Sequence, residues 1–76
     1  MAMKIHFYQA SNGEWTWRLR ARNGQVVANA AETYKTRPGA LRAAERFAGI
    51  TGFAVYEDHD HGHILVRESV QPNQRL

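Results

Sequence analysis

The sequence contains no cysteine, which removes several ways of stabilising a small domain. Disulfide bonds and thiolate metal sites are excluded, and nothing indicates an oxidising compartment. No stretch approaches the roughly 20 apolar residues that a membrane-spanning helix needs. The N-terminus also lacks the apolar run that is typical of a signal peptide. We therefore expect a cytoplasmic protein that does not interact with membranes.

With 76 residues, the chain is long enough for one domain and no more. A domain this short buries only about 60% of the surface that its unfolded chain exposes, so its core is marginal. Small domains gain further stability from disulfides, a metal or a partner chain. We expect one domain over residues 1–70, a frayed C-terminal tail over residues 71–76, and a homodimer as the source of the additional stability.

The net charge of +3 is unevenly distributed along the chain. Residues 1–46 hold eight lysines and arginines against three acidic residues, whereas residues 47–76 hold two arginines against four acidic residues. Such asymmetry is typical of a nucleic-acid-binding face. It also fits an assembly in which the acidic segment of one chain contacts the basic segment of another.

Apolar and polar residues alternate with a two-residue period in three segments, residues 4–9, 14–21 and 25–30. This period predicts three strands. The turn signals Asn12-Gly13 and Asn23-Gly24 separate them, and Asn23-Gly24 is expected to supply the positive backbone angles of a tight hairpin turn. The first part of the chain therefore reads as a three-stranded antiparallel meander.

Apolar residues then recur at three- and four-residue spacing up to Ala48, which predicts a helix. Thr36 is a suitable N-cap, because its hydroxyl oxygen can accept a hydrogen bond from a free amide of the first turn. Gly49 is placed where a helix ends with a left-handed residue, and Ile50 is expected to pack back on the last turn.

The two-residue period returns in residues 53–56 and 63–67, and residues 57–62 are the expected connecting turn. The predicted fold class is therefore α+β, with three antiparallel strands, one helix and two strands. Two strands form a marginal unit alone, so this hairpin must add to a sheet.

The segment 13–19, the Asn23-Gly24 turn, the apolar pair Val26-Val27 and Tyr34 together resemble the core motif of the YegP-like family of domains of unknown function. That motif runs Gly-x-Trp-x-Trp-Arg-Leu, an Asn-Gly turn, an apolar pair and a tyrosine before the helix. The resemblance implies two such units in one continuous sheet with exchanged C-terminal strands. Because this chain holds one unit, the resemblance implies a homodimer, and it implies no catalytic residues.

The two tryptophans share a strand face, and we expect them to form the core under the helix rather than to stack on bases. The predicted core residues are Trp15, Trp17, Leu19, Leu41 and Phe47.

The opposite face carries basic and aromatic side chains that suit phosphate groups, although a solvated polar face is the default for such a sheet. The candidate binding residues on it are Arg18, Arg20, Arg22, Tyr8 and His6.

The expected turn contains His59, His61 and His63 between acidic residues. Imidazole and carboxylate groups are good ligands for zinc, nickel or copper. These residues are nearly consecutive, however, and no matching pair stands out elsewhere, so we expect a solvated turn and no metal site. Whether the turn ever binds a metal stays open.

No glycine-rich phosphate loop, nucleophile–base pair or paired carboxylates stand out, so we expect no enzymatic activity and no cofactor. The sequence favours a small homodimeric binding domain, an adaptor or inhibitor that contacts another protein. The alternative is a nucleic-acid-binding module that uses the basic sheet face.

Overall fold

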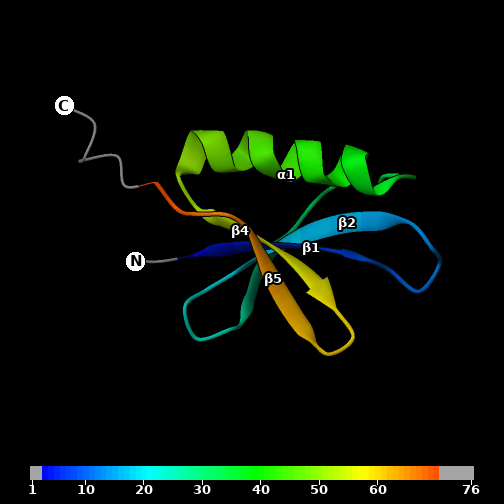
Figure 1. The fold of residues 1–76 in the computed structure, drawn as a ribbon, viewed down its shortest axis with the longest axis horizontal. Helices are drawn as coiled ribbons and strands as arrows, with labels where there is room; N and C mark the ends of the chain where they lie inside the picture. The colour runs from blue at the N-terminus through cyan, green and yellow to red at the C-terminus, as the bar shows by residue number, and fades with distance from the viewer. Residues whose placement is uncertain (1–2, 71–76) are drawn as a thin grey trace.

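The computed structural model describes residues 3–70 and places one helix on one face of a five-stranded sheet (Figure 1). The order of three strands, a helix and two strands confirms the predicted α+β class. The tail expected at residues 71–76 lies outside the described residues. The elements are β1 (Lys4–Gln9), β2 (Trp15–Arg20), β3 (Val26–Asn29), α1 (Arg37–Thr51), β4 (Ala54–His59) and β5 (Gly62–Arg67).

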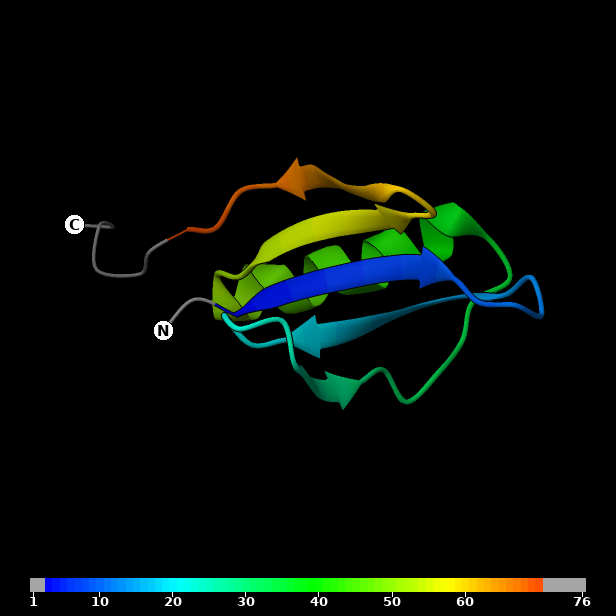
Figure 2. The same ribbon diagram turned by 90° about the horizontal axis from the view of Figure 1, so that it is seen from below.

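The strands lie in the order β3-β2-β1-β4-β5, so the N-terminal strand is at the centre (Figure 2). β1, β2 and β3 form the predicted antiparallel meander, and β4 and β5 form an antiparallel hairpin. The two parts meet where β1 pairs with β4 in parallel. The chain reaches β4 through α1, because a parallel neighbour requires a crossover connection.

The two loops of the meander share the pattern Ala-x-Asn-Gly and the same hydrogen bonds. The amides of Gly13 and Gly24 each donate to the alanine carbonyl three residues earlier at 2.9 Å. The side-chain oxygens of Asn12 and Asn23 accept from the amide two residues later at 3.0 Å. Only the glycines have a positive φ, 89° in both loops. The expectation of a positive angle at Asn23 is therefore wrong, because this three-residue loop needs the left-handed conformation only at its last position.

α1 begins as predicted, with Thr36 Oγ1 accepting from the amide of Gly39 at 3.2 Å. Pro38 in the first turn is tolerated because that turn has no backbone acceptor for its missing amide. No helix among the described residues is long and apolar enough to cross a membrane.

The predicted helix end at Gly49 is wrong, because α1 continues to Thr51. Gly52 is the left-handed cap, with a φ of 81° and its amide donating to the carbonyl of Ala48 at 2.7 Å. The apolar stripe of the helix stops near Ala48. The helix itself continues, because its backbone hydrogen bonds form whether or not the side chains are apolar. Ile50 is 79% exposed, so it does not pack back on the helix as expected.

The core lies between α1 and the central strands. The helix contributes only alanines to its buried centre, which lets α1 lie close to the sheet. The predicted core residues are partly buried around this centre, and the Trp17 ring stacks on Phe47 with centroids 5.2 Å apart. The residues of the buried centre are Ile5, Phe7, Val55, Ala40, Ala44 and Ala48.

The C-terminal hairpin turns more tightly than predicted. β4 extends to His59, which pairs with Gly62, so only residues 60–61 connect the strands. Glu57 and Asp58 belong to the strand because each has a partner on its own side of the sheet. Glu57 faces α1 and pairs with Arg37, whereas Asp58 faces away from α1 and contacts the ring of His6.

Candidate functional site

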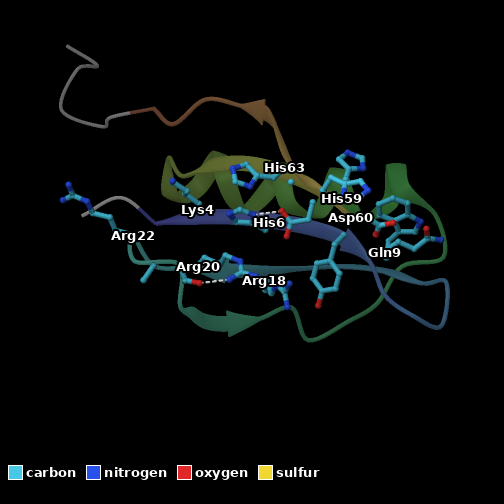
Figure 3. Close-up of a pocket in the computed structure, with 16 residues that line it drawn as sticks. Lys4, His6, Gln9, Arg18, Arg20, Arg22, His59, Asp60 and His63 are labelled. Carbon is cyan, nitrogen blue, oxygen red and sulfur yellow. Dashed lines mark hydrogen bonds and ion pairs between the residues drawn. The ribbon is translucent and has the colours of Figure 1, made fainter.

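The sheet face that α1 leaves uncovered forms an open groove of about 960 Å³ (Figure 3). The groove is lined by side chains from β1, β2, the β2–β3 loop and the β4–β5 hairpin. All five residues that the sequence assigned to a binding face line this groove, namely Arg18, Arg20, Arg22, Tyr8 and His6. The predicted face is therefore one continuous surface.

The register of β1 and β2 explains this arrangement. Lys4 is opposite Arg20 and His6 is opposite Arg18, so alternate residues of both strands share the open face. The guanidinium carbon of Arg18 lies 4.3 Å from the centroid of the Tyr8 ring, a cation–π contact. Nη1 of Arg20 donates to the carbonyl of Gly24 at 2.6 Å.

The groove has two chemically different sides. Lys4, Arg18, Arg20 and Arg22 make the side formed by β1, β2 and the β2–β3 loop strongly basic. The side formed by the hairpin carries a mixture of histidines and aspartates from residues 58–63. An anionic group would therefore be attracted to the first side, and the second side offers ligands of the kind that bind metals.

His6 lies between these two sides and is 6% exposed. Its Nδ1 is 2.6 Å from Oδ1 of Asp58, which accepts a hydrogen bond from the ring. The Tyr56 ring stacks on His6 with centroids 5.2 Å apart. The His63 ring meets both rings edge-on, with its centroid 5.4 Å from that of His6 and 4.9 Å from that of Tyr56.

The ligand atoms of His6, Asp58 and His63 all lie within 4.8 Å of one another. His59 and His61 are exposed and do not belong to this group. Sequence reasoning missed the cluster because it considered the histidines of the turn together. The cluster depends on the parallel register of β1 with β4, which no local pattern indicates.

On the covered face, Arg37 and Glu57 form a two-pronged ion pair. Nε and Nη2 of Arg37 donate to the two carboxylate oxygens of Glu57 at 2.9 and 2.5 Å. These hydrogen bonds lower the pKa of Glu57 and raise the pKa of Arg37, while desolvation acts in the opposite direction on both. The pair satisfies a buried carboxylate next to Phe7, so its role is structural.

A family model described as a domain of unknown function (DUF1508) matches residues 10–47, half of the chain. The matched segment contains both Ala-x-Asn-Gly loops, β2, β3 and most of α1. The chain belongs to the DUF1508 family. The predicted YegP-like membership is thereby confirmed. No curated protein and no solved structure matches the chain significantly.

The DUF1508 match covers part of the groove only. Arg18, Arg20 and Arg22 lie within the matched residues, whereas His6 precedes them and the hairpin follows them. Because the family description assigns no function, the chemistry of the groove must be argued from the residues of this chain.

Proposed function

We propose that this DUF1508 domain is a non-enzymatic, cytoplasmic protein-interaction module that acts as a homodimer, in the manner of an adaptor or inhibitor. Two copies join their sheets into one through their C-terminal strands. The observation that carries this proposal is the open, apolar edge of β5.

Within residues 3–70, β5 pairs with β4 on one side and has no strand on the other side, where its backbone groups can accept a partner strand. Ile64 is 59% exposed and Leu65 is 45% exposed, on opposite faces of the strand. Proteins usually protect such an edge with charged residues, proline or a bulge. β5 has no proline and only one arginine or acidic residue, Arg67, and its one irregularity lies at the same end, where Arg67 and Leu65 pair with Val55 and Tyr56. This edge therefore favours a partner strand.

A second copy of the chain is the occupant that fits best. An antiparallel pair of β5 strands has two-fold symmetry, so the same apolar residues cover one another on both copies. The other edge strand, β3, has four residues rather than six, and its pairing with β2 is irregular at Leu19 and Arg20. Both edge strands contain one irregularity, but the longer strand β5 offers more hydrogen bonds to a partner.

The family resemblance implies a more specific arrangement of this dimer, in which the two chains exchange their C-terminal strands. In the structure, β5 pairs with β4 of its own chain. An exchanged dimer would keep these contacts but take the whole hairpin from the other copy. Gly52, with its positive φ, lies in the short connection between α1 and β4 and would serve as the hinge.

Light scattering at micromolar concentration tests the dimer. We expect a mass near twice the 8.7 kDa of one chain. Ile64→Lys should yield a folded monomer, because it places a charge in the apolar contact of the β5 edge. Val27→Lys is the matched control on the β3 edge, where Val27 is 52% exposed, and it should leave the dimer intact. A clean monomer of the original chain at high concentration would overturn the proposal.

A cysteine pair distinguishes exchange from simple edge pairing. Lys4 and Ala54 are direct neighbours across the β1–β4 pair, and the chain has no other cysteine. In the double variant Lys4→Cys/Ala54→Cys, exchange gives a disulfide between chains, seen as a covalent dimer on a non-reducing gel. Edge pairing alone gives a disulfide within the chain.

The basic side of the groove supports a second candidate, a nucleic-acid-binding module. Arg18 and Arg20 line the groove beside Lys4 and Arg22, and these positive charges would attract phosphate groups. The Tyr8 ring already contacts Arg18, and the Tyr56 ring already stacks on His6. We therefore expect a nucleic acid to be bound through its phosphates and not by stacking of its bases on these rings.

Binding of random single-stranded DNA and RNA at increasing salt tests this candidate. Phosphate contacts release counterions, so the logarithm of the affinity should fall linearly with the logarithm of the salt concentration. The variant Arg18→Ala/Arg20→Ala should flatten that slope without unfolding the domain. Absence of binding at low salt would leave a protein partner as the only candidate.

A further inference from the structure

We propose that His6, Asp58 and His63 form a binding site for one divalent transition-metal ion, with zinc as the best match. The three residues come from β1, β4 and β5, and their ligand atoms all lie within 4.8 Å of one another. Figure 3 shows the His6 and His63 rings side by side at the groove.

The donor set fits this class of metal. Zinc binds imidazole nitrogen and carboxylate oxygen at about 2.0–2.2 Å, so ligand atoms around one tetrahedral ion are about 3.3 Å apart. Nδ1 of His6 and Oδ1 of Asp58, at 2.6 Å, lie closer than that separation and would move slightly apart to admit an ion. An ion would replace the proton that these two atoms share. The His63 ring has to approach further, and its exposure on the edge strand leaves room for it to rotate.

Two of the three ligands are held in place by the fold. His6 is stacked on Tyr56 and almost fully buried, and the side chain of Asp58 is 20% exposed. Because β4 is anchored in the core through Val55, the spacing between His6 and Asp58 is set by the sheet rather than by a loop. A histidine-rich turn alone lacks such preorganisation.

The surrounding charges predict how the site is completed. Three protein ligands leave one tetrahedral position for an exchangeable group. Lys4 lies close by, with its Nζ 5.6 Å from the centroid of the Tyr56 ring, and Arg18 is opposite His6 in the register. These cations oppose a bare metal ion, so an anionic group such as a carboxylate is favoured in the open position.

Titration of the full chain without a histidine tag, using Zn²⁺ alone, tests the site. We expect one ion bound per chain by calorimetry, and a tetrahedral absorption spectrum when Co²⁺ replaces Zn²⁺. His63→Gln and Asp58→Asn should each weaken binding by roughly tenfold to a hundredfold or more, since even the loss of an outer-shell partner has an effect of that size.

His61→Gln is the matched control, because His61 is exposed in the same hairpin and does not belong to the cluster. It should bind Zn²⁺ as the original chain does. Thermal unfolding without metal checks that each variant is folded. His63 is exposed, so its replacement spares the core, and Asp58→Asn keeps a hydrogen-bond acceptor for His6.

Three outcomes would overturn the proposal. The first is no binding at all. The second is an effect of His61→Gln as large as that of His63→Gln, which would show an adventitious ion only, held by the turn. The third is unchanged affinity in Asp58→Asn and His63→Gln, which would place the ion elsewhere.

Discussion

The two faces of the sheet differ in what their side chains contact. On the face under α1, Ile5, Phe7 and Val55 are fully buried against the alanines of the helix. On the open face, neighbouring residues of the same strands are charged or aromatic and contact one another in pairs, as Arg18 contacts Tyr8. The covered face therefore supplies most of the stability of the fold, and substitutions on the open face are expected to leave the domain folded.

The largest expected effect comes from two adjacent residues of β1 that point to opposite faces. Phe7→Ala should destabilise the domain by about 3–5 kcal/mol, which is the typical cost of truncating a buried aromatic residue. In so small a domain that loss should unfold it, as circular dichroism would show. Tyr8→Ala, which loses a cation–π contact on the open face, should cost about 1 kcal/mol. Equal effects would mean that the two faces do not differ in this way.

A smaller effect is expected at the rim of the core. Trp17 is partly buried and stacks on Phe47 rather than filling the centre under the helix. Trp17→Ala should therefore cost about 3 kcal/mol, the lower end of the range for large aromatic residues. Urea unfolding of Trp17→Ala beside Phe7→Ala measures the difference. If Trp17→Ala is the more destabilising variant, then the centre of the core lies at β2 instead of β1 and β4.

Glu57 is the exception on the covered face, because it is a buried charge. The hydrogen bonds from Arg37 lower its pKa below the ordinary value of 4.5, so the folded state favours the carboxylate. The resulting stability is fully present above that ordinary value and is lost as the pH falls through the lowered pKa.

Glu57→Gln should lower the free energy of unfolding at neutral pH by about 1 kcal/mol, a small value because Arg37 is half-exposed and screened by solvent. The variant should also lose stability less steeply in acid than the original chain, as urea unfolding over a pH series would show. Glu68→Gln, at an exposed residue, is the control and should follow the original profile. Identical profiles for all three chains would contradict a contribution from the pair.

Local patterns in the sequence were enough to predict the order of elements, the N-cap at Thr36 and which residues share the open face of the sheet. Each of these depends on a period or a turn signal within a few residues. The same reasoning assigned the centre of the core to the tryptophans because of their size. The structure gives that position to Phe7 and Val55, because the parallel pairing of β1 with β4 makes these strands the middle of the sheet.

Local patterns could not predict the cluster of His6, Asp58 and His63 either. His6 and Asp58 are 52 residues apart in the sequence, and only the register of β1 with β4 brings them together. Glu57 and Asp58 were assigned to a turn because charged residues are common in turns. In the strand they face opposite sides, each with a partner from a distant segment.

The smallest expected effect is at Gly49, on the outer side of α1. This position is exposed, like the open face of the sheet, but it has no side chain that contacts another residue. A β-carbon at Gly49 would meet nothing within 4 Å, and its φ is not positive. Gly49→Ala should therefore stabilise the domain by about 0.5–1 kcal/mol, because alanine loses less backbone entropy in a helix interior. Gly52→Ala is the matched control, and it should destabilise the domain because Gly52 has a φ of 81°. Thermal unfolding of both variants measures the two shifts, and a destabilised Gly49→Ala would indicate that the helix ends at Gly49 after all.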